Sequence, residues 1–345
     1  MEDHGQLPPE LQQRVHQEVE QTKARSGWPA SRTLAALGIA RRSSYRWLEE
    51  EAWAKERPAE PPRPVPLYEA LTEEQQAVLA YARRHPTLRH RELAWRMVDE
   101  DVAYLSPSTV YRILKRANLV SPWRRRAKRT RPAVERASRP DERWSTDLMQ
   151  VRVGGGVYPM VAFLDEYSRY IVHHEILLSM DGLSVSTAAQ KAIETLPKGA
   201  DGRPSASPEI RSDNGSCYIS KEFRVVLTEN GLGHHRIHPH CPEENGLMER
   251  ANRTLREGLE GEGEPSDLLE AASAMARIVR RYNQTRLHSA LGYLPPLEYY
   301  RGDPATRFEE RRRKLSQARH HRRERNLNLR QRTLPLEGGE VVTSG

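Results

Sequence analysis

The segment WSTDLMQVRV, residues 144–153, alternates polar and apolar side chains and predicts a β-strand with Asp147 near its middle. The glycines at 154–156 then predict a tight turn. VYPMVAFLDE (157–166) and YIVHHEILL (170–178) predict two further strands, the first joined to 144–153 as a hairpin. These residues therefore begin an antiparallel sheet.

The pattern changes after this sheet. Helices are predicted over 185–196 and 221–230, and they alternate with short strands that end in PEIRSDNG (208–215) and HHRIHPH (234–240). A long helix is predicted to begin near Glu244. Antiparallel strands followed by helix–strand alternation predict a mixed five-stranded α/β sheet flanked by helices.

Three carboxylates fall at chemically suggestive places in this sheet. Asp147 lies within the first strand, Asp213 follows a strand at an Asn-Gly turn, and Glu249 lies one to two turns into the long helix, with 35 residues between Asp213 and Glu249. Carboxylates from separate elements that meet at one sheet edge are the ligands expected for two hard cations. Such ions, roughly 3.5–4 Å apart, assist in-line phosphoryl displacement. Taken singly, each carboxylate is more often a surface charge.

The phase of the long helix supports an exposed Glu249. A buried stripe is predicted from Leu247, Ala251, Leu255 and Leu259. Glu249 then lies on another face together with Arg253 and Arg256, four and seven residues later.

Charge is unevenly distributed along the 345 residues. The net charge of +8 divides into +8 for residues 1–140, −6 for 141–300 and +6 for 301–345. Basic arms suit a polyanion such as DNA, and an acidic centre between them suits a site that binds cations. The longest apolar runs fall far short of a membrane span, and residues 1–20 lack a signal-peptide pattern. A soluble intracellular protein is expected, and two cysteines make no disulfide framework.

The first 120 residues predict two helical units of the helix-turn-helix kind. Residues 27–50 predict two helices around a Gly38 turn, with the second opened by Ser43. A proline-rich linker follows, and then a helix with a Thr72–Gln75 capping box. Two more helices are predicted over 89–99 and after Ser106-Pro107.

Basic residues dominate 111–140, with eleven Lys or Arg against one Glu. Such a run is often a solvated spacer, but its place between two helical units and a catalytic candidate favours DNA binding. The residues expected to contact DNA in the helical units and this run are Arg41, Arg42, Ser43, Arg46, Ser108, Thr109, Arg112, Lys115, Arg116, Trp123, Arg124, Arg125, Arg126, Lys128 and Arg129.

Four segments together resemble the integrase core of bacterial insertion-sequence transposases, which retroviral integrases share. They are WSTDLMQV, FLDEYSRYIV, RSDNGSCY and HCPEENGLMERANRTLRE, and the closing YNQTRLHSALGYLPPLEYY (282–300) is typical of the bacterial branch. The resemblance covers about 143–302 strongly and the helical units more loosely.

The resemblance implies an RNase H-like fold and a metal-dependent polynucleotidyl transferase. Asp147, Asp213 and Glu249 match the family's catalytic metal ligands, which implies two Mg²⁺ ions per site with Mn²⁺ as a substitute. Arg253 and Arg256 match basic positions that contact terminal DNA, and Asn245 with Gly246 matches the family's asparagine-glycine pair; Asn245 is also expected to contact DNA.

The expected partners are the double-stranded ends of a mobile element and a target DNA, with no membrane. Joining two ends requires at least two subunits, so a homodimer or homotetramer on DNA is expected in the bacterial cytoplasm, associated with the nucleoid. The His/Cys spacing of the retroviral zinc module is missing, so no zinc is expected. The cluster His238, His240 and Cys241 is interpreted as a loop beside DNA.

The predicted domain order has six parts. A helix-turn-helix domain (1–56), a proline-rich linker (57–70), a second helix-turn-helix domain (71–120) and a basic linker (121–141) precede the catalytic core (142–302) and a basic C-terminal tail (303–345). Two other functions fit parts of the pattern. One is a DNA-binding regulator that has lost catalysis, and the other is a metal-dependent nuclease that cuts without joining.

Overall fold

A computed structural model describes residues 9–56, 66–120, 136–200, 204–238 and 245–333. By its internal contacts the chain separates into two compact units, of which one is Leu67–Asn328 and the other contains the N-terminal helices. No helix in the described ranges combines the length and hydropathy that a membrane span needs.

Three helices form the N-terminal unit: α1 (Pro9–Ser26), α2 (Ala30–Ala36) and α3 (Arg41–Glu56). Val19, Leu34 and Trp47, one from each helix, are buried together as its small core. The turn at Gly38 has the predicted left-handed backbone, at φ +70°. Helix α3 begins at Arg41, so the prediction that Ser43 opens it is wrong by two residues.

The second helical unit contains α4 (Thr72–Arg84), α5 (His90–Asp99) and α6 (Pro107–Arg116), as predicted. Its core includes Val78, Met97 and Val110, which are fully buried. Ser106 caps α6 by accepting a hydrogen bond from the amide of Thr109 at 3.3 Å.

The start of α4 differs from the prediction. The backbone N–H of Leu71 donates to the Glu74 carboxylate at 2.9 Å, and the Gln75 amide donates to the carbonyl of Ala70 at 2.8 Å. The predicted Thr72–Gln75 capping box is therefore wrong, because the helix begins at Thr72 itself and Glu74 is the residue in reach of the preceding amide.

Five strands form one mixed sheet in the order β3-β2-β1-β4-β5. Their bounds are β1 Arg143–Val153, β2 Gly156–Asp165, β3 Ile171–Ile176, β4 Glu209–Ser212 and β5 His234–Arg236. The pairs β1–β2 and β2–β3 are antiparallel, whereas β4 pairs in parallel with β1 and β5 pairs in parallel with β4. This confirms the predicted mixed α/β sheet.

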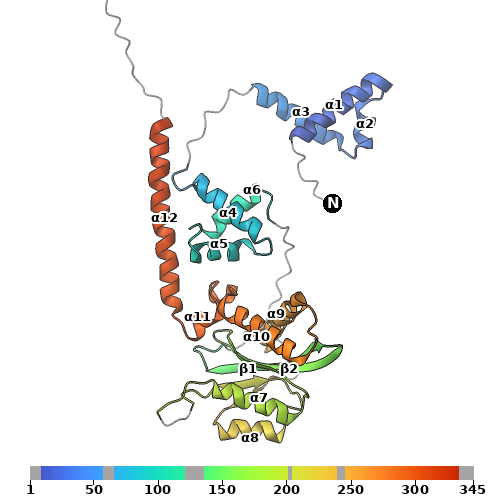
Figure 1. Ribbon diagram of the computed structural model, residues 1–345. Coiled ribbons are helices and arrows are strands. Elements are labelled where there is room, and N and C mark those ends of the chain that lie inside the picture. Colours follow the sequence, from blue (N-terminus) through green and yellow to red (C-terminus); the bar gives the residue numbers. More distant parts are fainter. Residues whose placement is uncertain (1–8, 57–65, 121–135, 201–203, 239–244, 334–345) are drawn as a thin grey trace, which may run out of the picture. The chain divides into compact units, whose positions relative to one another are not determined.

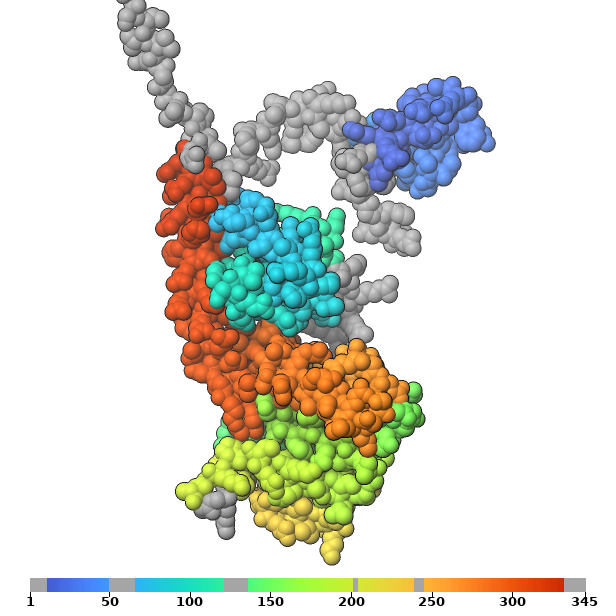
Figure 2. Space-filling view, viewed as in Figure 1, coloured from blue at the N-terminus to red at the C-terminus, as the bar shows by residue number. Residues whose placement is uncertain are grey.

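Helices cover both faces of the sheet (Figures 1 and 2). One face packs against α9 (Gly246–Glu262) and α10 (Leu268–Gln284), and the other packs against α7 (Gly182–Glu194) and α8 (Lys221–Glu229). Along β1, the odd-numbered Met149, Val151 and Val153 belong to the core with α9 and α10. Since side chains alternate along a strand, Asp147 also points to the α9 face.

The chain closes with a short 3-10 turn (η2, Ser289–Leu291), α11 (Pro296–Tyr300) and α12 (Pro304–Thr333). The segment predicted only as a basic tail is thus mostly one helix of 30 residues.

Candidate active site

Asp147 is half-buried on β1 and is held by the helix that packs across the sheet. The amide nitrogen of Asn252, on α9, donates to an Asp147 carboxylate oxygen at 3.0 Å. Asn252 is itself buried, because its side chain lies on the side of α9 that faces the sheet. One side of the Asp147 carboxylate is therefore fixed by α9.

Asp213 comes to the same sheet edge through the parallel pairing of β1 with β4. Trp144 pairs with Ile210 and Ser145 with Arg211, so continuing that register by two residues places Asp213 level with Asp147. The amide of Gly215 donates to the Asp213 carboxylate at 2.9 Å. A side chain at Gly215 would place its Cβ 3.0 Å from that carboxylate, so the turn after β4 favours glycine.

Glu249 is exposed and lies in the first turn of α9, slightly earlier in the helix than predicted. The buried stripe also differs from the prediction, because Met248 and Asn252 are buried and Leu247 packs only partly against the core. The prediction that Glu249 is exposed still agrees with the structure, since its side chain lies outside that stripe.

The charges of Asp213 and Glu249 act on the carboxylate of Asp147. Burial and then the charge of Asp213 raise the pKa of Asp147 to about 6, with a smaller contribution from Glu249. The hydrogen bond from Asn252 acts in the opposite direction and is outweighed. A carboxylate whose pKa is raised by two neighbours lies in a region with too little positive charge.

This charge deficit suits a divalent cation. In the described parts of the chain, no group of three or more His, Cys, Asp or Glu side chains is arranged to hold a metal ion. The three carboxylates are electrostatic neighbours without forming a closed coordination shell. Their donor set nevertheless fits Mg²⁺, which prefers oxygen ligands, keeps several waters and needs only one or two carboxylates for each ion.

Two other acidic residues near the sheet, Asp165 and Glu166, are held by structural contacts. Asp165 accepts hydrogen bonds from the amides of Asp141 and Ser168, at 2.8 and 2.7 Å. Glu166 forms a buried ion pair with Arg211 at 3.1 Å. Both carboxylates therefore already have full sets of partners.

A cationic cluster lies beside Tyr282 and was missed as a unit. The rings of Tyr282 and His288 meet edge to face, 4.8 Å apart. Burial, and then the charges of Arg286, Arg169 and Arg250, lower the pKa of His288 to about 4. Arg169 Nη1 and His288 Nε2 are buried and lack a hydrogen-bond partner within the described residues. The three guanidinium charges therefore act together on His288 and disfavour its protonation.

Only part of this cluster had a signal in the sequence. The sequence of the closing segment leaves Arg286 and His288 open between DNA binding and packing, and the buried Tyr282 packs in the core with α9. Arg250 directly follows Glu249, so the sequence alone places it next to a candidate metal ligand. Arg169 enters from the turn after β2, and nothing in its local sequence indicates that position.

The residues expected to contact DNA differ in exposure. Arg253 and Arg256 on α9 are exposed, whereas Asn245 is buried, with its carbonyl oxygen lacking a hydrogen-bond partner in the described ranges. Those exposed on α3 and α6 are Arg41, Arg42, Arg46, Ser108, Arg112, Lys115 and Arg116, while Ser43 and Thr109 are half-buried. Outside the described residues lie Trp123, Arg124, Arg125, Arg126, Lys128, Arg129, His240 and Cys241.

Comparison with known proteins identifies the family. The integrase core domain family matches residues 137–242, and a second integrase core domain family matches 230–296. The transposase InsD of insertion element IS2E from Escherichia coli is described as putative and is 30% identical over 206 residues, which cover 57% of this chain and 92% of that protein. The chain belongs to the integrase-core transposases of insertion elements.

A second relative is similar over more of this transposase. The 39.2 kDa protein of insertion element IS476 from Xanthomonas euvesicatoria is 26% identical over 297 residues, 80% of this chain and 81% of that protein. Among solved structures, the catalytic core of HTLV-2 integrase in complex with magnesium is 19% identical, with a TM-score of 0.38, and the match covers 48% of this chain and 99% of that one. The family matches, together with the five-stranded sheet, give the transposase an integrase-core, RNase H-like architecture, with helical units before it.

Proposed function

We propose that this transposase binds the terminal inverted repeats of its element and catalyses Mg²⁺-dependent strand cleavage and strand transfer. The observation that carries the proposal is the effect of the Asp213 and Glu249 charges on buried Asp147, with the three residues coming from the middle of β1, the turn after β4 and helix α9. Uncompensated carboxylates at one sheet edge have little structural value, because their mutual repulsion costs stability. Binding of metal ions explains why they lie together.

In this mechanism the three carboxylates would hold two Mg²⁺ ions. When bound, the ions would activate the attacking oxygen and stabilise the leaving oxygen of an in-line displacement. Water first attacks the phosphodiester at the element's end and releases a 3′-OH. That hydroxyl then attacks a target phosphodiester, so one bond forms as another breaks and no covalent protein–DNA intermediate is needed.

The chain's own residues orient the reactants. Asn252 fixes the Asp147 carboxylate through its 3.0 Å hydrogen bond, and the Gly215 amide fixes that of Asp213. The cluster of Arg169, Arg250 and Arg286 supplies positive charge for a DNA phosphate on the side of α9 that follows Glu249. Asn245 is buried directly before the first residue of α9, a position that suits fixing the start of that helix.

The helical units supply DNA recognition in this proposal. Helices α3 and α6 present exposed Arg and Lys side chains of the kind that enter a major groove or contact phosphates. The domain boundaries predicted from the sequence remain part of the proposal. Two element ends must be cut and joined together, which requires a homodimer or homotetramer on DNA. A bacterial cytoplasmic location at the nucleoid follows from that substrate.

One assay separates this function from the two alternatives. Purified protein is incubated with a labelled terminal-repeat duplex, Mg²⁺ and a target plasmid, and wild type is compared with Asp213→Asn. Strand transfer by wild type alone supports the proposal. Cleavage without joining would indicate a nuclease, and binding without any chemistry would indicate a regulator.

Asn252→Ala is expected to weaken metal binding without removing a ligand. Loss of a residue that orients a metal ligand typically costs about 10–100-fold in metal affinity. The Mg²⁺ concentration for half-maximal cleavage should therefore rise by at least about tenfold. Thr254→Ala is the matched control on α9, because the Thr254 hydroxyl bonds only to the carbonyl of Arg250 in its own helix. Equal metal dependence in both variants would contradict this role.

Arg250→Ala is expected to weaken DNA binding in a salt-dependent way. Removal of one phosphate contact lowers the slope of log affinity against log salt concentration by about one. Fluorescence anisotropy on a terminal-repeat duplex at several salt concentrations measures that slope. Arg277→Ala on α10 is the control, since Arg277 is already paired with Glu262 at 2.7 Å. An unchanged slope for Arg250→Ala would exclude the phosphate contact.

A further inference from the structure

Helix α12 packs with a stripe of polar side chains instead of an apolar one. Arg311, Arg322 and Asn326 are 3%, 7% and 2% exposed, although the helix is long and highly charged. Buried arginines are rare unless they are paired, because removing a charge from water is costly. The partners of this stripe therefore show what α12 is built to hold.

Arg311 joins the catalytic core to the second helical unit. Its guanidinium donates to both carboxylate oxygens of Asp99, at 2.8 and 2.6 Å, where α5 ends. It also donates to the carbonyls of Gly292 and Tyr293, at 3.0 and 2.7 Å, in the turn after η2. The ring of Trp95 on α5 lies 4.9 Å from the guanidinium carbon.

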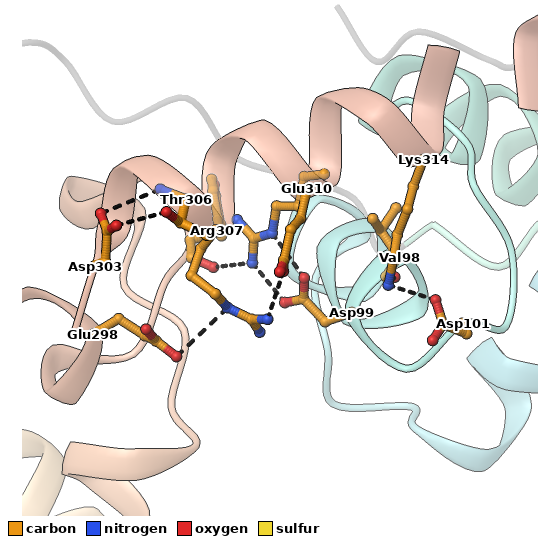
Figure 3. A network of polar contacts seen from close by, with 11 residues as sticks. Val98, Asp99, Asp101, Glu298, Asp303, Thr306, Arg307, Glu310 and Lys314 are labelled. Carbon is orange, nitrogen blue, oxygen red and sulfur yellow. Dashed lines mark hydrogen bonds and ion pairs between the residues drawn. The ribbon is translucent and has the colours of Figure 1, made fainter. Parts of the chain in front are cut away.

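The contacts continue along α12 beyond Arg311. Lys314 donates to the carbonyl of Val98 at 3.2 Å and pairs with Asp101, as Figure 3 shows. Arg322 bonds to Glu74 at 2.7 Å and to the carbonyl of Tyr104 at 3.1 Å.

Asn326 completes the stripe by donating to the carbonyls of Leu67 and Glu69, at 3.1 and 3.0 Å. From Arg311 to Asn326 the partners therefore come from two separate segments of the second helical unit, residues 67–74 and residues 98–104. A helix that spans a unit in this way restrains its rotation as well as its distance, since contacts several turns apart cannot all persist if the unit turns.

The other end of α12 is fixed to the catalytic core. Arg307 pairs with Glu298 of α11 at 3.5 Å. The ring of Phe308 packs so closely on Gly292 that a Cβ there would lie 2.6 Å from it. None of these contacts uses the exposed residues of α6, so Arg112 and Lys115 keep their access to solvent.

We propose that α12 is a strap that holds the second helical unit in one position against the catalytic core, with Arg311 as the positioning residue at the joint. This inference rests on the proposed function, because its purpose is to set the spacing between DNA bound by α6 and the carboxylates that cut it. Cleavage then occurs at one phosphodiester, counted from the site that α6 binds.

The strap is tested first by a distance measurement that needs neither DNA nor metal. Spin labels carried by non-cysteine ketone amino acids are placed at the exposed Ala117, after α6, and Val225, on α8. Wild type should give one narrow distance distribution, which Arg311→Ala and Asp99→Ala should each broaden severalfold. The double variant should be no broader than either single one, since both remove the same contact. Arg313→Ala, an exposed neighbour on α12, is the control.

The second readout is the position of the cut on a labelled terminal duplex. Arg311→Ala should spread cleavage over several phosphodiesters while keeping the affinity for the duplex, and Arg313→Ala should keep a single cut. A broad distribution in wild type, or a narrow one in both Arg311→Ala and Arg322→Ala, would overturn the strap. Circular dichroism shows whether a variant is unfolded. If Arg311→Ala is unfolded, Asp99→Ala removes the same ion pair from the side of α5. A narrow distance distribution in wild type, combined with no cleavage by wild type, would instead contradict the proposed function.

Discussion

Glu249→Gln is expected to abolish strand cleavage and strand transfer while the transposase stays folded and binds DNA. The substitution keeps the size of the side chain and removes its charge. One of the three carboxylate ligands for the metal ions is therefore lost. Metal-ion stabilisation of a transition state amounts to several kcal/mol. Since each 1.36 kcal/mol changes a rate tenfold, cleavage should fall by at least about 1,000-fold.

Stability should change little in this variant. Glu249 is exposed in the first turn of α9, where a negative charge interacts favourably with the helix dipole by about 0.3–1 kcal/mol. Glu257→Gln is the matched control, because Glu257 is an exposed glutamate two turns later on the same helix. Rates are measured on a labelled terminal duplex at saturating Mg²⁺. A cleavage rate of Glu249→Gln within tenfold of the wild-type rate would contradict the assignment of Glu249 to the active site.

Trp144→Ala is expected to have the largest effect on stability. Trp144 is fully buried on β1, in the core formed with α7 and α8. Its indole N–H donates at 3.1 Å to Asp141, which also accepts from the hydroxyl of Tyr300 at 2.8 Å. Truncating a buried tryptophan costs about 3–5 kcal/mol, and the cavity would lie three residues from Asp147.

Hydrogen exchange of β1 and β2 amides measures this loss in the full-length chain. Val157→Ala on β2 is the control, since Val157 is 56% exposed and its truncation should stay within about 0.5 kcal/mol. A loss below about 1 kcal/mol in Trp144→Ala would mean that this core does not depend on the indole.

Local sequence patterns were sufficient for most elements of the core. The alternation in 144–153 predicted β1, and the Asn-Gly turn after Asp213 correctly indicated the end of β4. The position of Asp213 beside Asp147 depends on a parallel pairing between strands far apart in the sequence. Only the motif order and the family resemblance indicated that pairing in advance.

Features that depend on tertiary contacts were not predicted. Asn252 has no signal of its own, because a polar residue on a buried helix face is meaningful only once its partner Asp147 is known. Arg169 joins its cluster through the packing of β3 on α10, where the Asn283 side chain bonds to the backbone of Ile171. The role of α12 was missed for the same reason, since its buried stripe is polar and lacks the apolar periodicity that identifies a packed helix.

In the proposed active site, Asp147, Asp213 and Glu249 together bind two metal ions. Anomalous X-ray scattering from Mn²⁺, in crystals of the transposase bound to a terminal-repeat duplex, tests it most directly. We predict two anomalous peaks, roughly 3.5–4 Å apart, with all three carboxylates as ligands and the scissile phosphate between them. Metal bound elsewhere, or contacts to none of these three residues, would contradict the assignment of the active site.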